Sequence, residues 1–171
     1  MSDSSRYKLV QQNPDTKLWR VQALVDIRPG VVRGDIGGWV EGEHNLSQDI
    51  TSTAWVYEEA QVYGGAQVDG QAQVWGQAQV FGQAQVYGQA QVRGQAQVQK
   101  VCLYVQQPQY SMTATDTHLI IGCQAHTWEA WLGIGFISAL GRRYAYSPAE
   151  IRETSVLIKA LHKQVKRLTT E

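Results

Sequence analysis

Four side chains in the last third of the sequence could do chemistry together: Asp116, His118, Cys123 and His126. The spacing His-x4-Cys-x2-His offers up to three zinc ligands, and Asp116 or a water molecule could supply the fourth. The same residues could instead support nucleophilic catalysis, with Cys123 as the thiolate and His126 or His118 as its base. Neither spacing is diagnostic, because zinc sites more often combine two pairs of ligands. A structural role is the third interpretation, with Cys123 buried as a small apolar residue and the histidines at turns.

The elements that would position these four residues are predicted from the sequence after residue 98. Runs rich in β-branched and aromatic residues predict strands over 101–105 and 110–115. Asp116 and Thr117 then suit a turn into a further strand over 118–121. Thr127 is a suitable cap for a short helix that carries Trp128 and Trp131. The candidate residues should therefore lie on and between short strands of an α+β domain.

A longer helix is predicted over 148–168. Ser147 is a suitable N-cap, Pro148 fits the first turn, and Glu150 completes a capping box. Lysine and arginine residues near the end of the segment suit the negative pole of the helix dipole. Apolar and small residues follow three-and-four spacing on one side: Ile151, Thr154, Ile158, Leu161, Val165 and Leu168. We expect this helix to dock or to trimerise rather than to contact nucleic acid.

The middle of the chain is an internal repeat of six residues with the unit V-x-G-Q-A-Q. Aliphatic residues recur at every sixth position from Ile50 to Val98, and alanine follows by four positions each of those from Ile50 to Val92. A period of six does not fit an α-helix, whose apolar stripe returns after three and four residues. It is a multiple of the strand period of two, so valine and alanine should point inward and glutamine toward water. Glycine in the third place should relieve strain where the chain turns a corner.

One unit per side and three sides per coil give a triangular parallel β-helix. In this respect the sequence resembles the hexapeptide-repeat, left-handed β-helix family. We expect a mainly β protein with about three or more coils over 50–100, stacked about 4.8 Å apart. Because the open ends of such a helix would recruit further strands, both flanking parts should be caps. The segment 1–49 is predicted as a β cap, and 101–171 as an α+β cap that ends in the amphipathic helix.

The second place of each repeat unit should face outward, and its residue type varies. With eighteen residues per coil, three vertical columns are expected: Tyr57, Trp75 and Arg93; Tyr63, Phe81 and Gln99; and Thr51, Asp69 and Tyr87. Arg93 would then be placed for a cation–π contact in its column. The aromatic members and Arg93 are candidates for a subunit or partner interface, because few other apolar groups face outward. Alternatively, the rings stack only on one another and stabilise the coils.

Charge and composition limit the classes of function. Fifteen basic and fifteen acidic side chains give a formal net charge of zero, so the electric field of a typical nucleic-acid-binding protein is missing. Hexapeptide-repeat acyltransferases carry a catalytic histidine on the coils, and their carbonic-anhydrase relatives need several. Here no histidine or cysteine occurs between His44 and Cys102. We therefore expect no acyl transfer by the repeat and no cofactor.

Two cysteines are too few for a disulfide scaffold and favour a reducing compartment. The first residues lack the pattern of a secretory signal, and no apolar segment has the length of a membrane span. We expect a cytoplasmic protein without a membrane partner.

Two segments resemble a group of small phage and prophage proteins. The segment 34–41 reads GDIGGWVE and is followed by Glu43 and by NLS at 45–47, ahead of the V-x-G-x-A repeats. The segments TDTH at 115–118 and IGCQAH at 121–126 resemble the tail of the same group. The resemblance covers the chain to about Trp131, and it implies a β-helix fold and a phage origin.

These observations favour a non-enzymatic, phage-type accessory protein. It would be a rigid homo-oligomer, with a trimer favoured, that binds a host or phage component, and inhibition of a bacterial defence system is one use. An alternative is a small ligand-binding domain, or a metal- or thiol-dependent enzyme, at 110–146 on a β-helix scaffold. A second alternative is a purely structural oligomerisation module.

Overall fold

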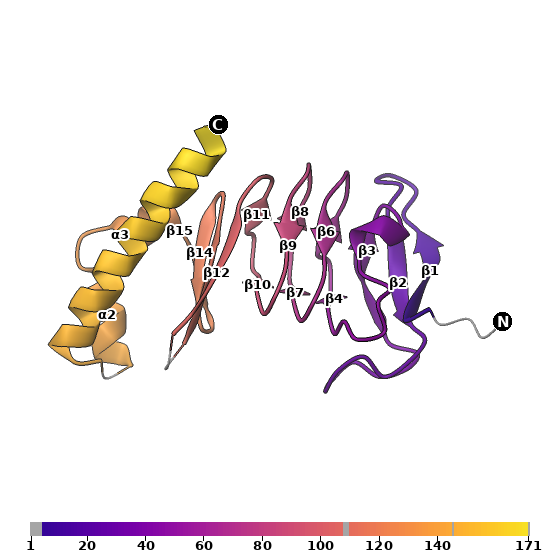
Figure 1. Ribbon diagram of the computed structural model, residues 1–171, viewed down its shortest axis with the longest axis horizontal. Helices are drawn as coiled ribbons and strands as arrows, with labels where there is room; N and C mark the ends of the chain where they lie inside the picture. Colours follow the sequence, from indigo (N-terminus) through magenta and orange to yellow (C-terminus); the bar gives the residue numbers. More distant parts are fainter. Residues whose placement is uncertain (1–4, 108–109, 145, 171) are drawn as a thin grey trace.

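The computed structural model describes residues 5–107, 110–144 and 146–170 and has three consecutive parts along one long axis (Figure 1). An N-terminal hairpin is followed by a stack of short strands, and a sheet covered by helices lies at the far end. The expected fold class is confirmed, because the stacked parallel strands form a β-solenoid of about three turns with a helical C-terminal cap. This arrangement matches the left-handed β-helix expected from the repeat.

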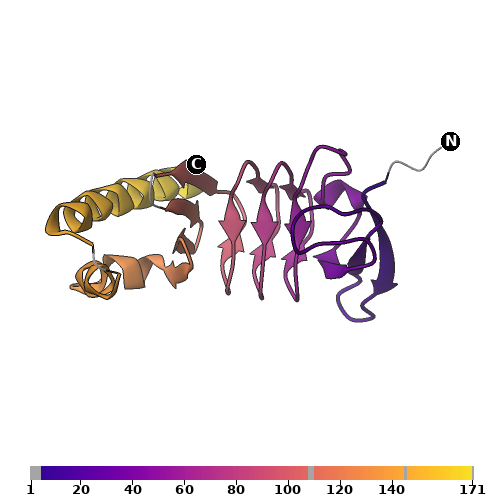
Figure 2. The same cartoon turned by 90° about the horizontal axis from the view of Figure 1, so that it is seen from below.

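The solenoid has three walls built from two-residue strands that pair in parallel with the strand eighteen residues later. The first wall contains β5 (Gln61–Val62), β8 (Gln79–Val80) and β11 (Gln97–Val98). The second contains β4 (Trp55–Val56), β7 (Gln73–Val74) and β10 (Gln91–Val92). The third contains β6 (Gln67–Val68) and β9 (Gln85–Val86). Figure 2 shows the coils side by side from a second direction.

The core of the solenoid follows from the repeat from Ala54 onward, whereas Ile50, which the same spacing predicts inside, lies in a turn and is 67% exposed. The repeated valines and alanines from Ala54 to Val98 are at most 1% exposed, and they fill the interior. Six repeat glycines sit at corners with φ between 63° and 70°, where a side chain would be strained. The corner before β5 has Glu58 in the glycine place, with φ of 53°. This corner, between β4 and β5, therefore lacks the residue type that its geometry favours.

The N-terminal part joins the solenoid through the first wall. Strands β1 (Tyr7–Gln12) and β2 (Trp19–Ala23) form an antiparallel hairpin, and β2 also pairs antiparallel with β3 (Ile36–Val40). Strand β3 then pairs in parallel with β5, and Leu46 bridges Val68 just after the short 3-10 helix η1 (Glu43–Asn45). The segment that contains β3 and Leu46 therefore already forms a first coil, ahead of the glycine-containing repeats.

Backbone carbonyls at the N-terminal end of the solenoid are capped by donor side chains. Apart from the bonds between paired strands, N–H groups of each coil donate to carbonyl oxygens of the next coil, so the matching carbonyls of the first coil have no preceding coil to pair with. The buried Arg6 donates to the carbonyls of Ser47 and Ala54, and the hydroxyl of Tyr7 donates to that of Leu46 at 2.6 Å. Arg28 donates to Thr53 at 3.1 Å. These contacts close the edge to further strands.

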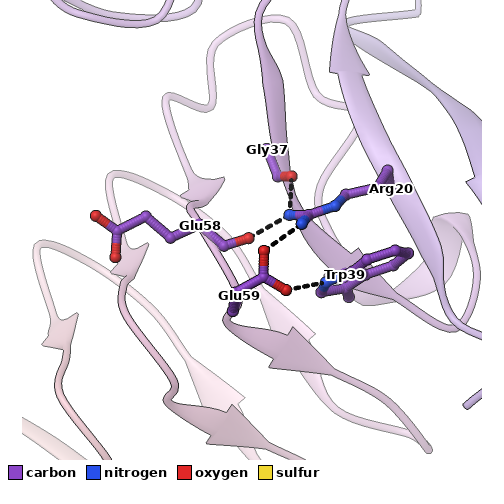
Figure 3. A network of polar contacts seen from close by, with 5 residues as sticks. All are labelled: Arg20, Gly37, Trp39, Glu58 and Glu59. Atoms are coloured by element: carbon purple, nitrogen blue, oxygen red, sulfur yellow. Dashed lines mark hydrogen bonds and ion pairs between the residues drawn. The ribbon is translucent and has the colours of Figure 1, made fainter. Parts of the chain in front are cut away.

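A second set of contacts holds the N-terminal hairpin against the corner at Glu58 (Figure 3). The guanidinium of Arg20 lies 4.1 Å from the ring centroid of Trp39 and donates to the carbonyls of Gly37 and Glu58. It also forms an ion pair with Glu59, whose second oxygen accepts from the Trp39 indole at 2.9 Å. These contacts hold the strained Glu58 corner in place.

The C-terminal part is an antiparallel sheet covered by helices. The strands β12 (Cys102–Gln106), β13 (Ser111–Thr115), β14 (His118–Ile121) and β15 (Gln124–Thr127) pair in sequence order. They are followed by α1 (Trp128–Leu132), α2 (Phe136–Arg143) and α3 (Pro148–Thr170). None of these helices combines the length and apolar character needed to cross a bilayer, within the described parts of the chain.

The cap residues predicted for these helices take their expected places. Thr127 accepts from the Ala130 N–H at the start of α1, and Ser147 and Glu150 form the reciprocal capping box of α3. The buried stripe of α3 contains Thr154, Ile158, Leu161 and Val165, which pack on the sheet and on the two tryptophans of α1. The amphipathic helix therefore docks within its own chain.

The last coil is capped by acceptor side chains, the reverse of the N-terminal end. Its free N–H groups would otherwise point into solvent. Thr113 and Thr117 accept from Gln91 and Gln97 at 3.0 and 2.9 Å. The carboxylate of Asp116 accepts from three successive N–H groups: those of Gln99, Lys100 and Val101. The sheet thus ends the solenoid through side-chain oxygens rather than through a further coil.

Candidate functional site

The aromatic residues expected on the outside of the solenoid form stacked pairs at two of its corners. The rings of Tyr57 and Trp75 are 3.6 Å apart with an interplanar angle of 6°, and those of Tyr63 and Phe81 are 5.3 Å apart at 8°. All four side chains are half-buried, whereas Tyr87 at the third corner is 44% exposed. The ring faces are used within each pair, and the rings therefore offer mainly their edges to a partner.

Arg93 does not make the cation–π contact that its column position predicts. Among the described residues, cation–π contacts are made by Arg20 and Arg143. Arg93 instead donates to the side chain of Gln91, and burial lowers the pKa of its guanidinium. Its Nε atom and the indole nitrogen of Trp75 are buried and have no hydrogen-bond partner among the described residues. The guanidinium is therefore bonded to a side chain of the wall, and it lies near enough to Cys123 for the two groups to interact.

The first wall forms a trough with a floor of amides. It is lined by Glu59, Gln61, Gln77, Gln79, Gln95 and Gln97. Gln95 donates to Gln77 one coil away at 3.5 Å. In sequence, these residues lie between the Tyr57 and Tyr63 corners in each coil, so the two stacked aromatic pairs border the trough. The other two walls are partly lined by residues of the C-terminal part. Tyr104 and Gln106 lie beside the second wall, and Lys100 and Leu168 lie beside the third.

Of the four residues that could do chemistry, Asp116 and His118 lie at one end of β14 and Cys123 at the other, while His126 lies on β15 opposite Leu119. Asp116 lies in the turn before this strand and binds the backbone of the last coil. His118 begins the strand and contacts Thr117 through Nδ1 at 2.9 Å, and burial lowers the pKa of its imidazole. Cys123 follows the other end of β14, and a four-residue strand spans roughly 13 Å. The strand therefore separates Asp116 from Cys123.

Gln124 occupies the space that a catalytic Cys–His pair would need. Its amide nitrogen donates to the exposed sulfur of Cys123 at 3.4 Å, and this contact is the main cause that lowers the pKa of the thiol. Its amide oxygen lies 3.2 Å from Nε2 of His126, whose ring packs edge-on against Trp131 and Phe136. Both side chains of a Cys–His dyad are thus present, but each is hydrogen-bonded to the Gln124 amide between them.

No three His, Cys, Asp or Glu side chains converge on a possible metal position within the described ranges. The candidate ligand set Asp116, His118, Cys123 and His126 is therefore not assembled in this structure. Cys102, the other cysteine, lies against the solenoid core, where burial raises the pKa of its thiol to about 12. Of the two thiols, Cys123 is the more exposed.

A pocket of about 180 Å³ lies beside Cys123 in the C-terminal domain. Its apolar lining includes Ile121, Trp131, Ile137 and Leu140, and its polar groups include Gln124 and Tyr144. We call it the C-terminal pocket. The sequence identified Cys123 and Trp131, but it did not indicate that α2 would place Ile137, Leu140 and Tyr144 opposite them. The half-apolar sequence of α2 is the one signal that could have suggested a covering helix.

Comparison with protein-family models, curated proteins and solved structures gives no match to this chain. The resemblance of the leader and tail segments to phage proteins therefore rests on their sequence motifs alone.

Proposed function

We propose that the protein is a non-enzymatic binding module whose interaction surface is the first wall of the solenoid. The observation that carries this proposal is the amide trough on that wall, bordered by the Tyr57–Trp75 and Tyr63–Phe81 pairs. The catalytic alternative has less support, because Gln124 separates Cys123 from His126 and because Asp116 is used by the last coil.

The chemistry of the trough suits association with a second protein surface. The trough lining has one carboxylate, Glu59, which is already paired with Arg20, and the other lining residues are glutamines, so little charge must be desolvated when the wall is covered. Each glutamine amide both donates and accepts, which lets one wall pair with a copy of itself or with a peptide backbone. Stacked rings at the borders are already ordered, and they lose little side-chain entropy on binding.

The proposed assembly is a homo-oligomer, with a trimer favoured, that then binds a host or phage component. The zero net charge of the chain removes the long-range repulsion that keeps many proteins apart. The phage-like motifs are the reason to look for the partner in the cytoplasm of a bacterial host, including its defence systems. A purely structural oligomer would assemble in the same way and bind no further partner.

The test introduces charge into the first wall. We expect the double variant Gln61→Lys with Gln79→Lys to remain folded but to lose self-association, as measured by size-exclusion chromatography with light scattering. The matched control places the same change on the third wall, at Gln67 and Gln85, where association should be retained. Equal behaviour of both variants and the original chain would refute the first wall as the interface.

Partner binding is tested separately, by capture of proteins from a bacterial host extract on the original chain and on both lysine variants. A partner retained by the control and lost by the first-wall variant supports the proposal. Replacement of Trp75 and Phe81 by serine should weaken the same binding. Because these rings also stack on their neighbours, the stability of the serine variant must be measured in parallel. If the serine variant is unfolded, the result with the lysine variants decides the test.

A further inference from the structure

The C-terminal pocket is independent of the solenoid walls and has no part in the proposed interface. It lies between the Cys123 end of the sheet and the helices α2 and α3. Gly141 lets α2 approach α3 closely, because a Cβ there would meet the side chain of Ile151 at 2.6 Å. Away from this contact, Ile137, Leu140 and Tyr144 line an unfilled space of about 180 Å³.

The size of the space limits the ligand to a compact molecule. An apolar cavity of roughly 150 Å³ in a protein core can stay dry and take up a single benzene ring. The C-terminal pocket is slightly larger than this and is open to solvent on one side. One ring, or two fused rings, therefore fit without rearrangement of the helices.

The lining determines the chemical class. The rings of Trp131 and Tyr146 and the aliphatic groups of Ile121 and Leu140 favour a planar, apolar molecule. None of the described residues that line the pocket is a lysine, arginine, aspartate or glutamate. A charged ligand would lose its hydration there without gaining a counter-charge, so the ligand should be neutral.

One edge of the pocket offers hydrogen-bond acceptors. The hydroxyl of Tyr144 accepts from the Gln124 amide at 2.9 Å, and the same amide nitrogen donates to the sulfur of Cys123 at 3.4 Å. A hydroxyl oxygen has two lone pairs, so it can accept a second bond from a ligand. We infer that the C-terminal pocket binds a neutral aromatic molecule of one or two rings that donates an N–H or O–H to the Tyr144–Cys123 edge. Phenols and indoles are the simplest members of this class.

The experiment titrates the full chain with indole, phenol, toluene, benzoate and benzylammonium. Binding is followed by nuclear magnetic resonance through the indole signal of Trp131 and the side-chain amide signal of Gln124. We expect indole and phenol to produce saturable shifts in both signals. Toluene should bind about fivefold more weakly, since one neutral hydrogen bond is worth about 1 kcal/mol. The two ions should bind at least tenfold more weakly than phenol.

Two variants localise the effect. Tyr144→Phe keeps the ring and should reduce the preference for phenol over toluene about fivefold. The same removal of a hydroxyl at Tyr87→Phe, on the solenoid, should change nothing. Thermal unfolding of each variant checks that its fold is intact, and the preference ratio remains informative even if the fold is less stable.

Three results would overturn the inference: the absence of saturable shifts with any neutral ring, equal binding of benzoate and phenol, or an unchanged preference in Tyr144→Phe. A fourth outcome identifies a different occupant. If N-acetyl-tryptophanamide binds more than tenfold tighter than indole, the pocket receives a side chain of a partner protein, and the small-molecule inference is wrong. None of these outcomes bears on the lysine variants of the first wall.

Discussion

The solenoid and the C-terminal domain solve the same problem of burying apolar side chains in different ways. In the solenoid, each valine and alanine is enclosed by identical neighbours one coil away, and the interior is filled. In the C-terminal domain, three helices of different length cover one sheet, and a pocket remains between them. A repeat can optimise one contact and copy it, whereas each contact of a unique domain must be fitted separately. Unfilled space and reactive groups accordingly gather in the unique domain.

The largest effect is expected at Asp116, where the two regions meet. Asp116→Ala removes an acceptor from three N–H groups of the last coil and should lower the free energy of unfolding by about 3 kcal/mol. Urea denaturation measures this loss. Asp116→Asn keeps one acceptor oxygen and should lose less. If the alanine variant were as stable as the original chain, the solenoid would not depend on this cap.

The difference in packing predicts unequal costs for truncated side chains. Val80→Ala in the filled core should cost about 2 kcal/mol, from lost burial and from the cavity that remains. Leu140→Ala removes a larger group but should cost only about 1 kcal/mol, because Leu140 is half-buried beside an existing space. Chemical denaturation of both variants tests the comparison, which fails if Leu140→Ala is the more destabilising change.

Two glycines with positive φ separate crowding from backbone strain. Gly76→Ala places a Cβ 3.2 Å from the Gly94 carbonyl oxygen in the next coil, in addition to the strain of φ 69°. Gly122→Ala meets no atom within 4 Å and carries the strain alone, at φ 55°. We expect losses of about 2 and 1 kcal/mol respectively, measured by thermal unfolding. Equal losses would mean that the coils can separate slightly at no cost.

Glycine in place of Glu58 should stabilise the corner between β4 and β5. Glu58 is exposed and has φ of 53° in the place where the other corners have glycine. Glu58→Gly removes the strain of a left-handed residue but adds entropy to the unfolded chain, and the net gain should be about 0.5 kcal/mol. Calorimetry would detect it as a small rise in the melting temperature. Gln83→Gly, in the place that follows the glycine of another corner, has no such strain to relieve and serves as the control.

The smallest effect is a pH dependence at the same corner. Hydrogen bonds from Trp39 and Arg20 lower the pKa of Glu59 below its ordinary value of 4.5. The unfolded chain therefore takes up a proton at higher pH than the folded chain. The stabilisation by Glu59 should be complete above pH 4.5 and should disappear as the pH falls through the lower, folded pKa. The difference in stability between the original chain and Glu59→Gln should shrink over that interval, and a constant difference would contradict the charge-based explanation.

Local patterns were sufficient for the elements but not for the contacts between them. Thr127, Ser147 and Glu150 correctly predicted the starts of two helices, because a cap involves only neighbouring residues. The ring pairs at the corners followed from the eighteen-residue coil. The hydrogen bond of Arg93 to Gln91, in place of a cation–π contact, did not follow, because it depends on the wall and on the C-terminal domain. Nor did the donor caps of Arg6 and Tyr7, which contact residues about forty positions away.

The amino-acid sequence alone determined the solenoid, because a period of six fixes which side chains point inward and each coil repeats the same hydrogen bonds. The tertiary structure decided where the chemistry lies. It placed Asp116 under the last coil, separated Cys123 from His126 by an amide, and left a pocket beneath α2. These outcomes depend on how unlike surfaces fit together, and no periodic pattern in the sequence encodes that fit.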